Sequence, residues 1–108
     1  MEIEFENDAL RELFEDGVKA KSNKKYRLQQ SVIKQYISKV IALLNAPNIE
    51  SLYTMNSLHY EKKKGDLKGI EAIRINSKYR LEFVSRVEGD EPDLITICSL
   101  TEISNHYQ

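Results

Sequence analysis

The first half of the chain has apolar residues at helical spacing. Asn7 or Asp8 is placed to cap a first helix, whose apolar stripe consists of Ala9, Leu10, Leu13 and Phe14. A wider apolar face follows at Val32, Ile33, Tyr36, Ile37, Val40, Ile41 and Leu44. We therefore predict a short helix that ends near Gly17 and a second helix from about residue 23 to Pro47, paired as an antiparallel hairpin with one buried side.

The second half changes to the two-residue period of β-strands. Apolar residues alternate, or nearly alternate, over three stretches that polar turns separate: 69–75, 79–87 and 93–100. At the N-terminus, Ile3 and Phe5 alternate with glutamates and predict an added edge strand. These elements predict an α+β fold in which the two N-terminal helices pack on a small antiparallel sheet, with residues 1–108 as a single domain.

Composition narrows the class of protein. The 108 residues include 41% hydrophobic side chains, which suffices for a buried core. No apolar run approaches the roughly 18 residues of a membrane span, and the acidic N-terminus has no signal-peptide pattern. The single cysteine, Cys98, leaves no pair for a disulfide, and no metal-ligand cluster or glycine-rich phosphate loop is present in the sequence. We expect a cytoplasmic domain that contacts no membrane, binds no metal and needs no cofactor.

Charge is strongly segregated although the net charge is only −1. Residues 1–16 contain seven acidic side chains and one basic side chain, whereas residues 17–49 contain seven basic side chains and no acidic one. Residues 59–86 contain eight basic and four acidic side chains, and residues 88–102 are acidic again. The pattern permits a basic face for an anionic partner, but on charge alone ordinary solvated helix faces and a solvated loop are the favoured interpretation.

Two groups of cations are candidate ligands for phosphate. Four lysines share the loop before the first hairpin strand: Lys62, Lys63, Lys64 and Lys68. Arg74 and Arg80 lie on facing strands near their connecting turn, and guanidinium groups suit bidentate contact with phosphate. The alternatives are a solvated loop and two surface arginines that pair with Glu71 and Glu82.

Histidine and ring side chains complete the candidate chemistry. His59 precedes the lysines and His106 lies near the C-terminus, and imidazole transfers protons near pH 7. Tyr60 or Tyr107 offers a ring on which an RNA base can stack. Each of these side chains is also common as an ordinary surface, capping or terminal residue. Cys98, in mid-strand, fits a structural thiol better than a nucleophile.

Five short segments, taken in order, carry a family resemblance. They are Leu58-His59, Lys64-Gly-Asp-Leu-Lys-Gly69, Ile73-Arg-Ile-Asn76, Tyr79-Arg80 and Asn105-His-Tyr107. The ordered set resembles the HigB-like branch of the RelE/ParE toxin superfamily, over nearly the whole chain from about Phe5 to Tyr107. Two helices before an antiparallel sheet also fit that family.

The resemblance implies a bacterial type II toxin that cleaves mRNA on the ribosome and that a cognate, HigA-like antitoxin holds inactive. The chemistry it implies is attack by the ribose 2′-hydroxyl on the adjacent phosphate, with a base, an acid and cations supplied by the protein and no metal. By position, the resemblance assigns catalytic roles to His59, Lys64, Arg74, His106 and Tyr107. His106 is the first choice for proton transfer, with His59 as its partner or as a residue that positions substrate.

The resemblance also implies roles for the cationic side chains. Lys64 and Arg74 are expected to stabilise transition-state charge, and the RNA backbone is expected to contact Lys62, Lys63, Lys68 and Arg80. The tail reads His106-Tyr107 where relatives often read Tyr-His, so which group is base and which is acid stays open. Two other functions also stay open: a ParE-like inhibitor that binds DNA gyrase, and a catalytically silent relative that only binds an antitoxin.

Overall fold

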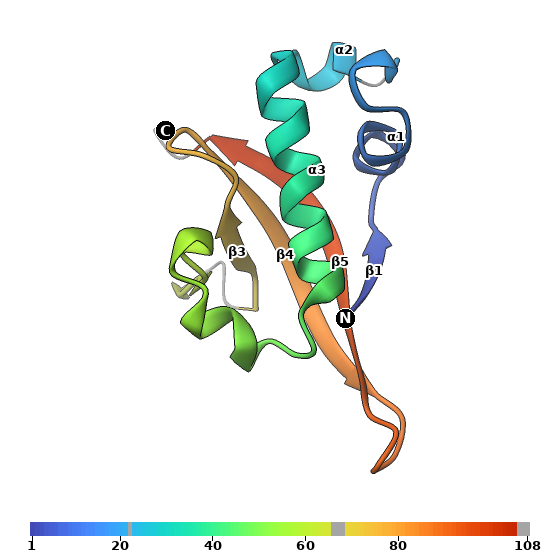
Figure 1. Ribbon diagram of the computed structural model, residues 1–108, viewed down its shortest axis with the longest axis vertical. Helices are drawn as coiled ribbons and strands as arrows, with labels where there is room; N and C mark the ends of the chain where they lie inside the picture. Colours follow the sequence, from blue (N-terminus) through green and yellow to red (C-terminus); the bar gives the residue numbers. More distant parts are fainter. Residues whose placement is uncertain (22, 66–68, 106–108) are drawn as a thin grey trace.

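One sheet with helical segments over one face makes up the fold (Figure 1). This computed structural model describes residues 1–21, 23–65 and 69–105. Its strands are β1 (Glu2–Phe5), β2 (Glu61–Lys62), β3 (Glu71–Arg74), β4 (Tyr79–Glu88) and β5 (Ile95–Asn105). Its helical segments are α1 (Asp8–Asp16), η1 (Gly17–Lys19), α2 (Asn23–Tyr26), α3 (Gln30–Asn45), η2 (Glu50–Thr54) and η3 (Asn56–Leu58). The α+β class predicted from the sequence is confirmed.

The sheet is mixed, which corrects the prediction of a purely antiparallel sheet. Its strand order is β1-β5-β4-β3-β2, and β1 pairs parallel to β5 while the other neighbours are antiparallel. The predicted N-terminal edge strand is therefore present, but in the opposite direction to the one that an antiparallel sheet needs. Alternation in a sequence specifies which side chains face the core and says nothing about the direction of the neighbouring strand.

A short strand that the sequence analysis missed lies inside the lysine loop. β2 pairs through its backbone with the edge of β3, where Glu61 is opposite Ala72 and Lys62 is opposite Glu71. Both residues of β2 are exposed and charged, so no apolar alternation marks the strand. The pairing nevertheless attaches the start of this loop to the sheet.

The predicted first helix is confirmed, including its cap. The Asn7 side chain accepts a hydrogen bond from the Leu10 N–H at 2.8 Å, so Asn7 rather than Asp8 is the N-cap of α1. The helix ends at Asp16, and its C-cap Gly17 has φ of 61° with ψ of −132°, a combination that strongly favours glycine.

The predicted second helix starts later than expected. Residues 23–26 form the separate α2, and α3 begins only at Gln30. The break is stabilised by the Asn23 side chain, which bonds both the N–H (2.9 Å) and the carbonyl (3.1 Å) of Leu28. The antiparallel hairpin of two helices is not confirmed, since Figure 1 views α1 nearly end-on while α3 runs along the length of the sheet.

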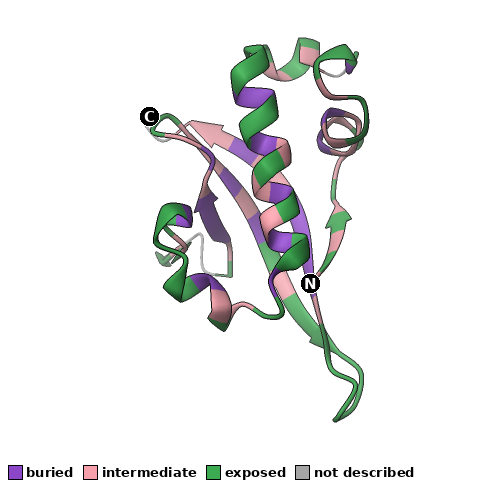
Figure 2. Cartoon of the chain, in the orientation of Figure 1, coloured by how far each residue is buried: buried purple, intermediate pink, exposed green. Residues whose placement is uncertain are grey.

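The core lies between α3 and the sheet, with α1 beside them (Figure 2). From α3 it receives Val32, Ile33, Tyr36, Val40 and Leu43, and from the sheet Ile73, Leu81, Phe83, Cys98 and Leu100. The Tyr36 hydroxyl donates to the Leu10 carbonyl at 2.8 Å, which satisfies a buried polar group and ties α3 to α1.

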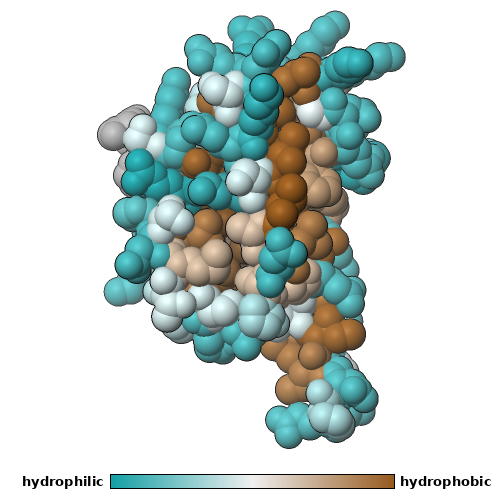
Figure 3. Space-filling view, in the orientation of Figure 1, coloured by the Kyte–Doolittle hydropathy of each residue, from teal (hydrophilic) through white to brown (hydrophobic). Residues whose placement is uncertain are grey.

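An arm formed by the far ends of β4 and β5 projects beyond the helices (Figure 1). Its apolar side chains Val84, Val87, Leu94 and Ile95 are exposed, and Figure 3 shows this apolar surface. The turn of the arm needs glycine at residue 89, because φ is 94° and a Cβ there would lie 2.7 Å from the Asp93 carbonyl oxygen. Within the described part of the chain, no helix is long and apolar enough to cross a membrane.

Candidate functional site

His59 and Arg74 meet at the end of the short helix η3 and the edge of the sheet. The Nε2 atom of His59 lies 3.4 Å from Nη1 of Arg74, which donates a hydrogen bond when Nε2 carries no proton. His59 is exposed and has a left-handed backbone with φ of 46°, a conformation uncommon for residues other than glycine. The left-handed turn lets the chain leave η3 and enter β2 within two residues.

A buried carboxylate holds the segment next to His59. Glu71 is only 3% exposed, and its Oε1 accepts a hydrogen bond of 2.6 Å from the Tyr60 hydroxyl. Its Oε2 accepts bonds from the N–H (2.9 Å) and the hydroxyl (2.5 Å) of Ser85. Burial, with Glu71 as the second cause, raises the pKa of Tyr60. Glu71 thus ties Tyr60 to two strands and is not the partner of an arginine.

Arg74 and Arg80 are directly opposite each other on β3 and β4. Arg80 donates to the carbonyl oxygens of Asn76 (2.8 Å) and Tyr79 (3.2 Å), so its guanidinium fastens the β3–β4 turn. Among the described residues, no carboxylate forms an ion pair with either arginine. Two like charges in register repel each other, and the pair therefore favours a bound anion.

Arg86, further along β4, differs from Arg74 and Arg80 because carboxylates neutralise its charge. It lies 2.7 Å from the Glu4 carboxylate and 2.8 Å from that of Glu88. The hydrogen bond from Arg86 lowers the pKa of Glu4, with a smaller contribution from Ser99. In contrast, Arg74 and Arg80 are half-buried and have no carboxylate partner among the described residues, so their positive charge is a local property of the site.

The described lysines of the loop surround a hollow of about 390 Å³. Lys62, Lys63, Lys64, Gly65 and Gly69 line it. Lys63 forms an ion pair of 2.8 Å with Glu61, while Lys62 and Lys64 are exposed. The lysine hollow is thus bounded by lysine side chains three to five residues after His59 in the chain.

A second hollow, of about 400 Å³, has ring and apolar walls and includes His59 itself. Its lining residues are Leu52, Tyr53, Met55, Asn56, His59 and Tyr60. Tyr53 and Tyr60 form a ring pair with centroids 5.3 Å apart. Tyr53, which the sequence analysis did not single out, comes from η2, and only the folded chain brings it to His59.

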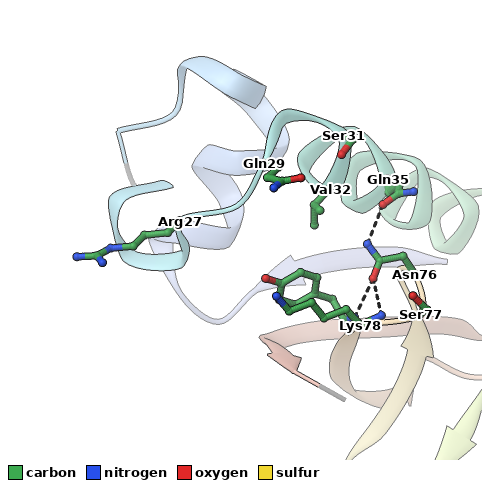
Figure 4. A pocket seen from close by; sticks show the side chains of 9 residues that line it. Arg27, Gln29, Ser31, Val32, Gln35, Asn76, Ser77 and Lys78 are labelled. Atoms are coloured by element: carbon green, nitrogen blue, oxygen red, sulfur yellow. Dashed lines mark hydrogen bonds between the residues drawn. The ribbon is translucent and has the colours of Figure 1, made fainter. Parts of the chain in front are cut away.

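A third, larger hollow of about 550 Å³ lies between the start of α3 and the β3–β4 turn (Figure 4). Its lining is mostly polar and includes Arg27, Gln29, Gln35, Asn76 and Lys78. Asn76 shapes the turn, since its amide donates to Gln35 at 2.9 Å and its oxygen accepts from the N–H groups of Lys78 and Tyr79. Of the predicted site residues that the structure describes, none lines this hollow.

Three of the predicted site residues, Lys68, His106 and Tyr107, lie outside the described residues. The preceding strand β5 is described to Asn105, which is opposite Tyr79, with Ser104 opposite Arg80. The described end of β5 therefore reaches the end of the sheet that carries the two arginines. Metal ligation has no candidate in the described chain, which holds no group of three or more His, Cys, Asp or Glu side chains suited to an ion.

Comparisons with known proteins bear on the family and the fold. A family model for the RelE-like toxin of the type II toxin-antitoxin system HigB matches residues 3–93. Toxin HigB-1 of Vibrio cholerae serotype O1 is 33% identical over 84 residues, which are 77% of this chain and 82% of the relative. The structure of a YoeB/ParE toxin from Agrobacterium tumefaciens has a TM-score of 0.52 at 17% identity, covering 99% of this chain and 100% of that chain. The last likeness concerns the fold alone.

Proposed function

This chain belongs to the HigB-like family of RelE-like toxins from type II toxin-antitoxin systems, and from that premise we propose that it is an endoribonuclease that cleaves mRNA on translating ribosomes. A type II toxin implies an antitoxin as partner. The observation that most supports cleavage is the 3.4 Å contact between His59 and Arg74, close in the chain to the lysine hollow. A group able to move a proton and a group able to hold phosphate charge stand side by side there.

The proposed reaction is transesterification within the RNA. The ribose 2′-oxygen bonds to the adjacent phosphorus as its proton passes to a base, and the bond from phosphorus to the 5′-oxygen breaks as an acid protonates that oxygen. The products are a 2′,3′-cyclic phosphate and a 5′-hydroxyl end. Negative charge builds on the phosphoryl oxygens between the two steps, so nearby fixed cations accelerate the reaction.

The proposed catalytic roles follow the chemistry of the side chains. His59 and His106 share proton transfer, and Arg74 and Lys64 hold the charge of the phosphoryl oxygens. Arg74 suits this role because its fork offers more than one N–H, so it can contact His59 and a phosphate together. Tyr107 is proposed to assist at the same site.

Substrate contacts extend the proposal beyond the reacting bond. Lys62, Lys63 and Lys68 are proposed to hold the RNA backbone, with Lys63 contributing less because Glu61 neutralises it. Arg80 is proposed to act mainly through the β3–β4 turn, whose carbonyls it already bonds, while adding positive charge opposite Arg74. The proposed substrate, translated mRNA, places the activity at ribosomes in the cytoplasm.

Purified toxin added to ribosomes that carry a defined mRNA tests the proposal. We expect cleavage products with 5′-hydroxyl ends, and no cleavage where a 2′-deoxyribose replaces the attacking ribose. Arg74→Ala should lower the rate about 10²–10³-fold, the loss expected for one preorganised charge-stabilising group. Arg11→Ala is the matched control, because Arg11 pairs with Asp8 and Glu15 on α1. Intact mRNA together with inhibited DNA gyrase would instead identify a gyrase inhibitor.

A further inference from the structure

We propose that the ring-lined hollow beside His59 holds one unstacked RNA base next to the cleaved bond, with Tyr53 as the stacking surface. This inference rests on the proposed function and adds a base-binding site to it. The hollow is lined by Leu52, Tyr53, Met55, Asn56, His59 and Tyr60 and measures about 400 Å³, within the usual range of about 300–1,000 Å³ for small-ligand sites.

Position is the first argument. His59 lines the ring-lined hollow and also contacts Arg74. Because this one side chain belongs to both, a phosphate bound by Arg74 would lie close to the hollow. A base and its phosphate are separated by one ribose. The geometry therefore allows one nucleotide to place its phosphate at Arg74 and its base against Tyr53.

Exposure of an aromatic ring is the second argument. Tyr53 is 58% exposed, although neighbouring Leu52 on the same short helix is buried. Within the described residues, the Tyr53 hydroxyl has no hydrogen-bond partner, and its ring contacts Tyr60 at 5.3 Å between centroids. The exposed ring offers a flat apolar surface, and every RNA base has a flat face that can stack on it.

Rigidity is the third argument. The ring beneath Tyr53 is Tyr60, whose hydroxyl bonds the buried Glu71 and whose ring lies 6.4 Å from that of Phe83. The stacking surface is therefore supported by the core of the sheet before any RNA arrives. Preorganisation lowers the entropy lost on binding and favours a specific position of the base.

The chemistry of the lining favours a base over a phosphate. Among its described lining residues there is no lysine or arginine, whereas the lysine hollow supplies three lysines and shares none of these residues. Met55 adds an apolar, adaptable wall, and the Asn56 amide can both donate and accept at the edge of a base. We expect Tyr53 to provide affinity and Asn56 to provide any preference among bases.

A cycle of protein and RNA changes tests the inference. Cleavage is first mapped on ribosomes that carry a defined mRNA, and mRNAs are then made with an abasic nucleotide on either side of the cleaved bond and a 2′-deoxyribose at the attacking position. Binding of toxin to these ribosomes is measured for the wild type, Tyr53→Ala and Tyr53→Phe. For one abasic position, we expect wild-type affinity to fall about 5- to 150-fold, the equivalent of about 1–3 kcal/mol for one stacked base.

The same abasic change should leave the affinity of Tyr53→Ala unaltered, because the stacking is already lost, while Tyr53→Phe should behave as the wild type. Independent, multiplying losses from the abasic nucleotide and from Tyr53→Ala would overturn the inference, as would unchanged binding by Tyr53→Ala. Both results leave cleavage by the wild type intact, so they are distinct from failure of the proposed function, in which no cleavage is mapped at all. Circular dichroism confirms that each variant is folded.

Discussion

At the scale of single residues, Glu71 is the link between the core and the site. Its two carboxylate oxygens bond Tyr60 on one side and Ser85 on the other, and the side chain is almost fully buried. A buried carboxylate is costly unless its oxygens are satisfied, so these bonds fix the local structure. Tyr60 follows His59 directly, and the position of the imidazole therefore depends on a residue that never needs to touch RNA.

Loss of the Tyr60 hydroxyl should destabilise the protein. In Tyr60→Phe, Oε1 of Glu71 loses its 2.6 Å partner, and we expect a loss of about 1–3 kcal/mol in the free energy of unfolding, measured by urea titration. Tyr53→Phe is the matched control, with an expected change within about 0.5 kcal/mol. Equal effects of the two substitutions would contradict the role assigned to Glu71.

Cys98 should be unreactive in the folded protein. Burial raises the pKa of its thiol to about 12, so the thiol stays protonated at pH 8.5. We expect iodoacetamide to label it slowly in buffer and rapidly in guanidinium chloride. Because the pKa is raised by folding, the unfolded state loses this proton first as the pH rises above about 9, and stability should fall from there toward pH 12. Labelling at equal rates in both solvents would show that the thiol is not buried.

Single residues also show what sequence patterns can and cannot reveal. Both side-chain chemistry and the family resemblance point to His59 and Arg74, and in the structure the two are in contact. Tyr53 and the link from Glu71 to Ser85 were missed, because contacts between residues 7–14 positions apart across different elements leave no periodic signal. The alternative interpretation, in which the two arginines pair with Glu71 and Glu82, does not hold for Glu71, since Tyr60 and Ser85 already occupy that carboxylate.

At the scale of elements, local chemistry decides where α1 and α3 begin. Asn7 caps α1 through a side-chain oxygen, and its amide also donates to the Thr101 carbonyl at 3.2 Å on β5. The start of α3 is delayed to Gln30 because α2 ends at Tyr26, where Arg27 adopts a left-handed backbone with φ of 52°, and the Asn23 side chain bonds the backbone of Leu28 beyond this break. Apolar periodicity identified both helices, but such side-chain to backbone bonds set their ends.

The two candidate caps of α1 can be separated by substitution. Asn7→Ala should lower the free energy of unfolding by about 0.5–2 kcal/mol, because the Leu10 N–H loses its acceptor. Asp8→Ala removes only an exposed ion pair with Arg11 and should cost clearly less. Chemical denaturation of both variants is the measurement, and a larger loss for Asp8→Ala would contradict the assignment of the cap.

At the scale of the whole molecule, the charge segregation seen in the sequence persists as separate regions of the fold. The acidic β1 and α1 lie at one edge of the sheet beside β5, whereas the lysine hollow lies at the other edge, where β3 and β2 pair. The family resemblance and the α+β class were both correct, since the order of motifs and the hydrophobic periodicity can be read directly from the sequence. The parallel direction of β1 and the break before α3 could not be predicted from the sequence and became visible only in the structure.

Binding to ribosomes that carry mRNA should weaken with salt through the lysine hollow. Each phosphate contact contributes about −0.7 to the slope of log affinity against log salt concentration for single-stranded RNA. The variant Lys62→Gln/Lys64→Gln should therefore make the slope shallower by about 1.4, whereas Arg11→Gln should leave it unchanged. Equal slopes for the wild type and the lysine variant would place RNA elsewhere on the molecule.

The central claim is that His59 and Arg74 together cleave translated mRNA, and mapping of 5′-hydroxyl RNA ends across the transcriptome tests it most directly. Ends are mapped minutes after induction of the wild type, His59→Ala, Arg74→Ala and the control Arg11→Ala, all at equal soluble protein levels. We predict new ends inside translated frames for the wild type and Arg11→Ala, and a loss of these ends for His59→Ala and Arg74→Ala. Growth arrest by the wild type without new 5′-hydroxyl ends, or undiminished ends in both site variants, would contradict the account.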